Sequence, residues 1–178
     1  MTPLLANTPQ IETDRLTLRA PLPADLPAFA AFAASPRSAF VRSDELDEGK
    51  IWRAFGHIIG HWVLRGFGQF VFADRATGAA LGMCGPWFPA GWPEPEVGWT
   101  IWAPEAEGRG YAFEAASAAR DHAFRDLGWQ TAVSYIAPDN ARSIALAKRL
   151  GASRDETAAH PGTEPCLVFR HSRPEGRP

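Results

Sequence analysis

The sequence predicts one domain of mixed helices and strands, and three stretches carry the prediction. Residues 15–19 alternate apolar and polar side chains, as expected of a strand with one buried face. Residues 68–85 hold two apolar runs joined by a turn that ends in Gly78, which predicts a β-hairpin. Residues 97–124 pass from β-branched and aromatic residues through glycines into an alanine-rich run, which predicts strand, turn and helix. Because no linker or internal repeat interrupts the chain, we expect residues 1–178 to form a single domain.

Size and charge narrow the possible functions. The 178 residues carry a formal net charge of -2, so neither a nucleic acid nor an anionic membrane recognised by bulk charge is expected as a partner. No apolar run reaches membrane length, and the N-terminus lacks the basic start of a secretion signal, so we expect the protein in the cytoplasm. Cys84 and Cys166 have no metal-ligand spacing, and we expect no metal.

Two helices are expected in the first third of the chain. Asp25 and its neighbouring prolines predict a helix over residues 25–34, which a Ser-Pro pair ends. An acidic segment supplies negative charge to the start of a second helix, over residues 47–65. Its predicted apolar stripe is Trp52, Phe55, Ile59, Trp62 and Val63.

Two histidines on the second helix, His57 and His61, are one turn apart and could resemble metal ligands or a catalytic pair. No glutamate accompanies them in a zinc-protease pattern. Histidines on an amphipathic helix more often pack or form hydrogen bonds, and that is the favoured interpretation.

The middle of the chain predicts a hairpin and then an irregular loop. The hairpin strands cover residues 68–74 and 79–85. The prolines and the glycine of residues 86–96 argue against regular structure. This loop either forms a wall of a substrate site or covers a sheet edge, and the sequence leaves both interpretations open.

The C-terminal part predicts a strand over residues 131–137 and a helix over residues 141–150 that Asn140 caps and Gly151 ends. Two short strands are expected at 152–157 and 166–171. Residues 1–10 and 172–178 are expected to be flexible.

The glycine-rich turn between the central strand and its helix is the strongest candidate for a ligand site. Such a junction points unpaired backbone N–H groups and the positive end of the helix dipole at one place, which suits a phosphate. The dinucleotide fingerprint fails because Phe113 stands where its third glycine would be, and no Gly-Lys-Ser/Thr phosphate loop is present. A turn that serves only tight packing is the alternative.

The segment Glu107-Gly108-Arg109-Gly110-Tyr111-Ala112 resembles the Gln/Arg-x-x-Gly-x-Gly/Ala turn of the GNAT superfamily of N-acetyltransferases. Residues 13–19 with Asp25, the hairpin, and Asn140-x-x-Ser143 follow in the order found in one branch, the ribosomal-protein N-terminal (alanine/serine) acetyltransferases. The resemblance implies a GNAT-like α/β (α+β) fold, a mostly antiparallel central sheet flanked by helices. It also implies acetyl-CoA as the cosubstrate.

The resemblance further implies a CoA site, and two positions depart from the family pattern. The implied CoA-binding residues are Trp99, Ile101, Trp102, Glu107, Gly108, Arg109, Gly110, Tyr111, Ala112, Asn140 and Ser143. Glu107 is an anion where the family has Gln or Arg, so Arg109 is the candidate for the missing charge. Ala147 stands where the family has a tyrosine that protonates the thiolate, so Ser143 is the candidate donor to the leaving sulfur, although a serine in the first turn of a helix is more often a capping residue.

An amine must be neutral before it can attack the acetyl group. The pKa of the amine therefore determines how much help from a catalytic base is needed. Neutralising a lysine amine at pH 7 requires about 4 kcal/mol, whereas an N-terminal amine requires only about 1 kcal/mol. Glu96, at the start of the central strand, is the candidate catalytic base and Glu94 is the second, although a solvated strand-end residue is an equal alternative for Glu96.

These observations predict an N-acetyltransferase that acts on a primary amine, either a protein N-terminus or a small molecule, by direct attack in a ternary complex. A non-catalytic acyl-CoA-binding sensor is the first alternative, motivated by Glu107 and by Ala147. An unrelated nucleotide-binding domain that uses the same turn is the second. The chain is expected to be a monomer or a homodimer, and the sequence leaves the identity of the amine open.

Overall fold

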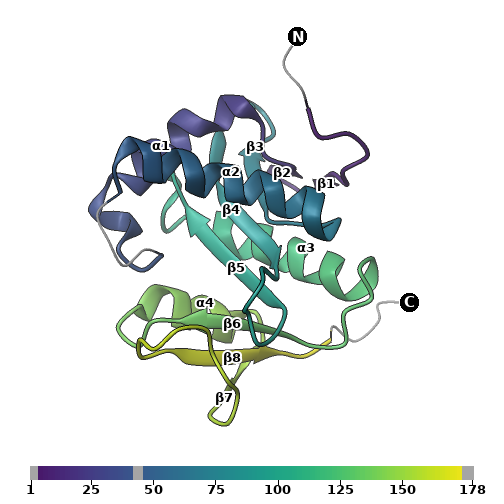
Figure 1. The fold of residues 1–178 in the computed structure, drawn as a ribbon. Helices are drawn as coiled ribbons and strands as arrows, with labels where there is room; N and C mark the ends of the chain where they lie inside the picture. Colours follow the sequence, from purple (N-terminus) through teal and green to yellow (C-terminus); the bar gives the residue numbers. More distant parts are fainter. Residues whose placement is uncertain (1–3, 42–45, 174–178) are drawn as a thin grey trace.

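A computed structural model describes residues 4–41 and 46–173, which form one eight-stranded sheet in the order β1-β2-β3-β4-β5-β6-β8-β7 (Figure 1). Neighbouring strands are antiparallel except β5 and β6, which are parallel. The predicted mostly antiparallel sheet is therefore confirmed. The strands are β1 (Ile11–Glu12), β2 (Leu16–Arg19), β3 (Phe70–Asp74), β4 (Ala80–Trp87), β5 (Glu96–Ile101), β6 (Ala132–Ile136), β7 (Ser153–Asp155) and β8 (Leu167–His171).

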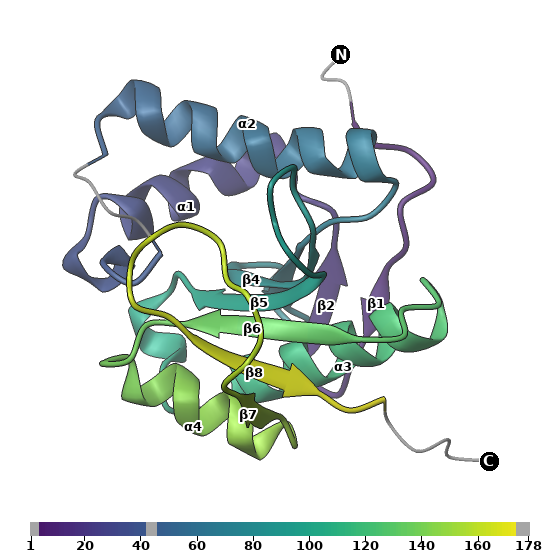
Figure 2. The same cartoon turned by 60° about the horizontal axis from the view of Figure 1, so that its bottom comes forward.

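Helices cover both faces of the sheet. Figure 2 shows α1 and α2 on one side and α3 and α4 on the other. Small residues let α3 lie close to the sheet, since a Cβ atom added at Gly85 of β4 would lie 3.2 Å from the Cβ of Ala119. The α-helices are α1 (Leu26–Ala33), α2 (Glu48–Arg65), α3 (Tyr111–Arg125) and α4 (Ala141–Arg149), and short 3-10 helices cover η1 (Pro23–Asp25), η2 (Pro36–Ser38) and η3 (Pro104–Ala106).

Helix α2 begins and ends where the sequence predicts. The carboxylate of Asp47 accepts a hydrogen bond from the Lys50 N–H, and Gly66 ends the helix in the left-handed conformation. The predicted apolar stripe is wrong at two positions, because Trp52 and Val63 are 67% and 70% exposed. The buried face is Ile51, Phe55, Ile58, His61 and Trp62. Trp52 and Val63 each follow a residue of this face by one position, and one residue turns a helix by about 100°.

The segment of residues 86–96 is more regular than its prolines suggest. Strand β4 continues through Pro86 and Trp87, and Pro86 lies opposite Val97 of β5. Proline is tolerated here because the neighbour on the other side, β3, begins only at Phe70, opposite Cys84. The prediction of an irregular start at residue 86 was therefore wrong, while residues 88–95 do form the predicted loop.

The C-terminal elements confirm the predicted order of strand, capped helix and two strands. The Asn140 side chain accepts a hydrogen bond from the Ser143 N–H at the start of α4, and Gly151 follows the helix with φ 81°. The ends expected to be flexible fall partly outside the described residues and stay a prediction. None of the described helices combines the length and the apolar character that a membrane crossing needs.

Candidate active site

The candidate site begins where β5 and β6 separate. The two strands pair at one position, Glu96 opposite Val133. One residue further along, the Ser134 hydroxyl donates to the Val97 carbonyl at 2.6 Å, where a ladder hydrogen bond would otherwise form. Figure 1 shows the two strands running at an angle to each other beyond this point. A gap therefore opens beside the second half of β5.

Backbone groups of β5 line this gap. Alternate residues of a strand direct their N–H and C=O groups to the same side, so Trp99 and Ile101 direct theirs toward the gap, as Val97 does. The carbonyl of Ile101 already accepts a hydrogen bond from Arg37 at 3.0 Å. The Trp102 backbone is engaged on both groups, since its N–H donates to Leu81 and its C=O accepts from Arg37. Trp99 and Ile101 therefore provide the N–H groups that a ligand in the gap could meet.

The glycine turn lies at the far end of the gap. Gly108 and Gly110 have φ values of 71° and 80°, a conformation that L side chains rarely adopt. The first intrahelical bond of α3 runs from the Glu114 N–H to the Gly110 carbonyl, so the N–H groups of Tyr111 and Ala112 have no acceptor within the helix. This cradle of N–H groups at a helix N-terminus fits a pyrophosphate.

Segments distant in sequence brace the turn from behind. The Arg15 guanidinium donates to the Arg109 carbonyl at 3.0 Å and to the Glu114 carboxylate at 2.7 Å. The Thr13 hydroxyl donates to the same carboxylate at 2.6 Å. The Thr13 to Arg15 stretch, noted in the sequence for its resemblance alone, thus fixes the start of α3.

Glu107 is held between two arginines. One oxygen of its carboxylate accepts from Arg37 at 2.7 Å, and the other accepts from Arg142 at 2.6 Å. These two hydrogen bonds hold the pKa of Glu107 below its usual range. The acid at this position of the turn is therefore neutralised by cations from η2 and α4, on opposite sides of the groove.

Arginines other than the expected one supply positive charge to the groove. The side chain of Arg109 turns away, with its guanidinium 5.2 Å from the centre of the Tyr111 ring, and Tyr111 itself is buried. Arg37, Arg142 and Arg149 line the groove instead. This groove, which we call the CoA groove after the cosubstrate that the resemblance implies, has a volume of about 960 Å³ and is also lined by Trp99, Ile101, Glu107, Gly108, Gly110, Ala112, Phe113, Asn140, Ser143 and Leu146, among others.

Ser143 lies at the midpoint of the site. Its hydroxyl oxygen accepts a hydrogen bond from the indole N–H of Trp99 at 3.2 Å, while the cap of α4 is made by Asn140. The Ser143 hydroxyl hydrogen therefore stays available for a second acceptor in the groove. Ala147, where the resembling family has a tyrosine, is fully buried against Ile136 and Phe169.

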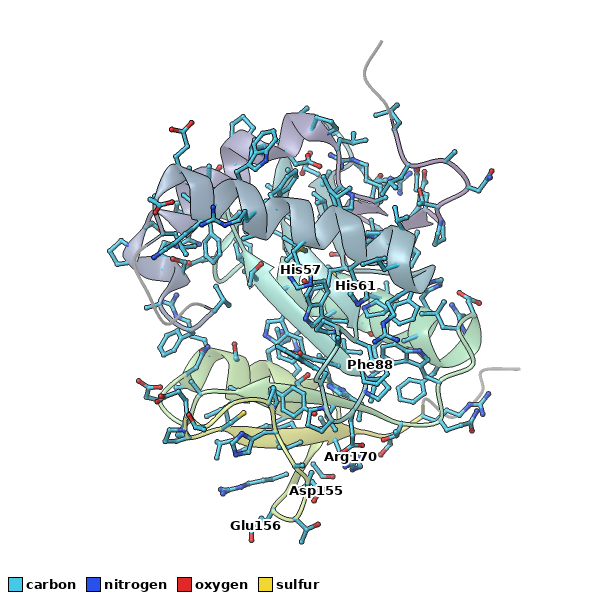
Figure 3. The ribbon with its side chains drawn as sticks, viewed as in Figure 1. His57, His61, Phe88, Asp155, Glu156 and Arg170 are labelled. Atoms are coloured by element: carbon cyan, nitrogen blue, oxygen red, sulfur yellow. The ribbon has the colours of Figure 1, made fainter. Side chains whose placement is uncertain are left out.

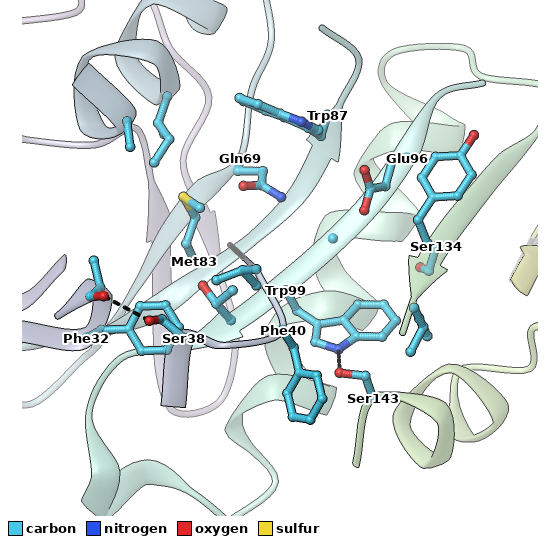
Figure 4. A pocket seen from close by; sticks show the side chains of 18 of the residues that line it. Phe32, Ser38, Phe40, Gln69, Met83, Trp87, Glu96, Trp99, Ser134 and Ser143 are labelled. Atoms are coloured by element: carbon cyan, nitrogen blue, oxygen red, sulfur yellow. Dashed lines mark hydrogen bonds between the residues drawn. The ribbon is translucent and has the colours of Figure 1, made fainter. Parts of the chain in front are cut away.

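A second cavity, of about 430 Å³, meets the CoA groove at Trp99, Thr100 and Ser143 (Figure 4). We call it the acceptor pocket. Its walls come from α1, α2, β4, β5 and β6, and Figure 4 shows Gln69, Trp87 and Glu96 around it. A volume of this size falls in the range of small-molecule sites.

Glu96 projects into the acceptor pocket. One of its carboxylate oxygens accepts from the indole N–H of Trp92 at 2.7 Å. Burial raises the pKa of Glu96 to about 7, against the opposing effect of hydrogen bonds from Trp92 and from the Tyr135 backbone. A carboxylate with a pKa near neutrality suits proton transfer.

Glu94, the second candidate base, forms an ion pair outside the acceptor pocket. Both of its oxygens accept from Arg170, at 2.7 and 2.9 Å, and this pairing lowers the pKa of Glu94. Arg170 also binds Asp155 at 2.8 Å, so the arginine ties the loop before β5 to β7 and β8 (Figure 3). Glu94 does not line the acceptor pocket.

The two histidines of α2 have different surroundings. His61 is buried, with Nδ1 2.8 Å from the Phe67 carbonyl and Nε2 accepting from the Phe88 N–H at 3.0 Å (Figure 3). Both ring nitrogens therefore contact the backbone, which fixes one neutral tautomer and confirms a packing role. His57 is exposed and lies at the acceptor pocket. In the part of the chain that the structure describes, no group of three or more His, Cys, Asp or Glu residues could hold a metal ion.

Sequence reasoning missed several residues that line these cavities. Arg37 lies in a short 3-10 helix without any motif, and Gln69 lies in the loop before β3. Arg142 could have been found, because it lies between the two residues of the Asn140-x-x-Ser143 motif. Residues in the first turn of a helix that flanks a phosphate site are natural candidates for its charge.

Known proteins share both sequence and fold with this chain. A sequence model of the acetyltransferase (GNAT) domain matches residues 15–153. The crystal structure of an acetyltransferase from Agrobacterium tumefaciens is 39% identical, with a TM-score of 0.87 over 97% of this chain and 99% of that one. Two proteins from Vibrio cholerae share the fold. One is a putative ribosomal-protein-serine acetyltransferase (23% identity, TM-score 0.72, 90% of this chain and 95% of that one). The other is a spermidine N-acetyltransferase in complex with CoA and spermine (18%, 0.69, 89% and 94%).

The family match covers more than half of the chain, and the glycine turn and the capped helix α4 fall where the GNAT resemblance expects them. The chain belongs to the GNAT acetyltransferases, and it is an acetyl-CoA-dependent N-acetyltransferase.

Proposed function

We propose that the enzyme transfers the acetyl group of acetyl-CoA directly to a primary amine, of a small molecule or a protein N-terminus, in a ternary complex. The observation that supports this most is the meeting of the two cavities at Trp99 and Ser143, with Glu96 in the acceptor pocket. A donor in one cavity and an amine in the other would bring their reacting atoms together at this junction.

The CoA groove supplies the donor contacts. The N–H groups from Gly108 to Ala112 would bind the pyrophosphate, and Arg37 and Arg142 would add positive charge on either side. The N–H groups of Trp99 and Ile101 face the gap along which the acyl arm would extend. When bound, acetyl-CoA supplies the acetyl group as an activated thioester.

The acceptor pocket supplies the base. Ionised Glu96 takes a proton from the ammonium form of the amine and frees the lone pair that attacks. The backbone N–H of Trp99 donates toward the negative charge that develops on the carbonyl oxygen.

Ser143 serves the leaving group. Because its oxygen already accepts from Trp99, its hydroxyl hydrogen is free to donate to the sulfur that departs. In this proposal Ser143 takes the role of the tyrosine that Ala147 replaces.

Calorimetric titration and thiol release test the proposal. We expect acetyl-CoA and CoA to bind, ATP and NAD to leave the heat signal unchanged, and thiol release to require an amine. Initial rates against both substrates should give intersecting lines, whereas parallel lines would indicate an acetylated enzyme and contradict direct attack.

The non-catalytic alternative gives a different result in the same experiments. A sensor would bind acetyl-CoA with comparable affinity, yet no amine in a broad panel would accelerate thiol release. Failure of acetyl-CoA to bind at all would reject both the transferase and the sensor.

A further inference from the structure

One wall of the acceptor pocket is apolar and rich in aromatic rings, and its chemistry bears on the amine that the proposed transferase uses. Six of its lining residues form what we call the aromatic wall: Phe29, Phe32, Phe40, Trp87, Trp92 and Trp99. Ile58 and Met83 also line the pocket. Aromatic surfaces of this kind bury flat apolar groups and attract a nearby cation through their ring faces.

Among the described lining residues, the acidic and basic side chains are Glu96 and His57. Glu96 is the one carboxylate among the described lining residues, and no lysine or arginine is among them. Several polar side chains of the lining already have partners within the protein. The Thr100 hydroxyl accepts from the Trp102 indole, the Ser134 hydroxyl donates to Val97, and Asn140 caps α4. Thr100 and Asn140 use one polar atom each in these bonds, and His57, Tyr135 and Ser143 add polar groups to the lining, whereas the aromatic wall offers ring faces.

Gln69 and Glu96 converge over a glycine. A Cβ atom added at Gly98 would lie 2.7 Å from Nε2 of Gln69 and 3.4 Å from Oε1 of Glu96. This Oε1 is not the oxygen that Trp92 binds. Figure 4 shows both side chains directed into the same space. The carboxylate oxygen of Glu96 and the carboxamide nitrogen of Gln69 thus flank one point above the Gly98 backbone. This point is next to the backbone N–H of Trp99, which faces the gap where acetyl-CoA would lie.

We infer that the acceptor is a primary amine with one positive charge and an apolar, aromatic body, of the arylalkylamine class. Its nitrogen lies between Glu96 and Gln69, and its ring lies against the aromatic wall. The inference depends on the proposed transferase function and narrows its substrate. A polyamine would bring further ammonium groups into a pocket whose described lining holds no second carboxylate, and unpaired buried charges are strongly disfavoured. A peptide N-terminus would bring backbone amides against the aromatic wall, whose ring faces offer them few hydrogen-bond partners.

The reaction balances on these groups. One proton of the bound ammonium passes to Glu96 and then to solvent. The nitrogen forms a bond to the acetyl carbon, the carbon–sulfur bond breaks, and the second amine proton ends on the sulfur of CoA. Gln69 is a positioning residue: its Nε2 faces this point in the structure, and a half-turn of the terminal amide would bring the carboxamide oxygen to the remaining N–H and orient the lone pair.

The substrate test compares three amines with the full-length enzyme: 2-phenylethylamine, spermidine, and a short peptide that begins with Ala or Ser. We expect kcat/KM for 2-phenylethylamine to exceed both others by at least about tenfold. A higher kcat/KM for spermidine or for the peptide would overturn the inference and leave the transferase function intact.

Binding provides a readout that does not need turnover. Three tryptophans line the pocket, so 2-phenylethylamine should change their fluorescence saturably when CoA occupies the groove. Saturable binding without acetylation would overturn the transferase function while the pocket assignment stands. No fluorescence change with 2-phenylethylamine would overturn the assignment.

Two variants test the role of Gln69. Gln69→Met keeps the side-chain length and removes the amide, and we expect KM for 2-phenylethylamine to rise about tenfold with KM for acetyl-CoA unchanged. Gly98→Ala should have a similar effect, because its Cβ displaces the Gln69 amide. Gln130→Met, at an exposed residue outside both cavities, is the matched control. Unchanged KM in both variants would remove Gln69 from the site.

Discussion

The indole of Trp99 and the hydroxyl of Ser143 form a hydrogen bond of 3.2 Å that joins β5 to α4 across the site. The bond lies at the junction of the CoA groove and the acceptor pocket. It directs the Ser143 oxygen toward Trp99 and so leaves the hydroxyl hydrogen for another acceptor. A side-chain contact between a strand and a helix thereby prepares a donor at the position where the thioester sulfur is expected.

Ser143→Ala should lower kcat more than it weakens CoA binding. A hydrogen bond to a charged group contributes about 1.5 to 3 kcal/mol, so we expect kcat to fall about 10- to 100-fold. Calorimetry should show the Kd for CoA changing much less. Ser143→Thr keeps a hydroxyl and should recover most of the rate. If the threonine variant were as slow as the alanine variant, the donor role would be rejected.

The raised pKa of Glu96 predicts how the acetylation rate depends on pH. Its pKa of about 7 means that the carboxylate form, which accepts the proton, becomes dominant as the pH rises through 7. In Glu96→Gln we expect kcat/KM to fall about 100-fold or more and this inflection to disappear. Glu94→Gln is the matched control, because Glu94 is paired with Arg170 outside the pocket. Its pH profile should keep the inflection near 7.

The same substitution should stabilise the fold at alkaline pH. The pKa of Glu96 is raised in the folded state, so its contribution to stability is fully present below about 4.5 and is lost as the pH rises through about 7. Replacing it with neutral Gln removes this loss. We expect the free energy of unfolding of Glu96→Gln at pH 8 to exceed that of the wild type by about 1 to 3 kcal/mol in urea titrations. A lower free energy of unfolding for Glu96→Gln at pH 8 would show that the buried carboxylate of Glu96 does not destabilise the wild type.

Glu107→Gln should tighten the binding of CoA. The wild-type carboxylate neutralises Arg37 and Arg142 at the groove, and its removal frees both cations for phosphate oxygens. Because the Arg142 side chain is 85% exposed, the gain should be modest, about two- to fivefold in Kd, and larger at low salt. Glu105→Gln, an exposed acid two residues away and outside the groove, is the control. Weaker CoA binding in Glu107→Gln would instead indicate that the carboxylate holds the arginines in a binding geometry.

The lowered pKa of His171 predicts that the folded protein loses stability in acid. Burial lowers its pKa to about 4, and its Nε2 contacts the Ser134 hydroxyl at 2.8 Å. A histidine with a depressed pKa contributes stability that is present above its unfolded pKa of about 6.5 and is lost as the pH falls through the folded value. The full loss between pH 6.5 and 4 is on the order of 3 kcal/mol. His171→Gln keeps a donor to Ser134 and should flatten this dependence in urea titrations, whereas an unchanged dependence would show that His171 does not cause it.

Much of the fold follows from signals that act over a few residues. Asn140 caps α4 as predicted, and Asp47 caps α2 at the predicted helix start, because a short side chain next to a helix start can reach its free N–H groups in most settings. Gly108 and Gly110 adopt the positive φ that the turn needs. The hydrophobic periodicity of α2 was less informative, because apolar residues lie on two adjacent stripes of this helix. Only tertiary packing determines that the stripe with Ile51 and Ile58 is the buried one.

The sequence by itself determined the order of strands and helices, the glycine turn before α3 and the family, because these depend on local backbone preferences and on short motifs. Tertiary structure alone decided how charge is distributed in the site. It brought Arg37 to Glu107, 70 positions away, paired Glu94 with Arg170, and set Gln69 beside Glu96. Such contacts depend on how the strands are arranged and where the sheet opens. Charged residues that pair in this way are not separated by a characteristic number of residues, so the sequence alone does not predict the pairs.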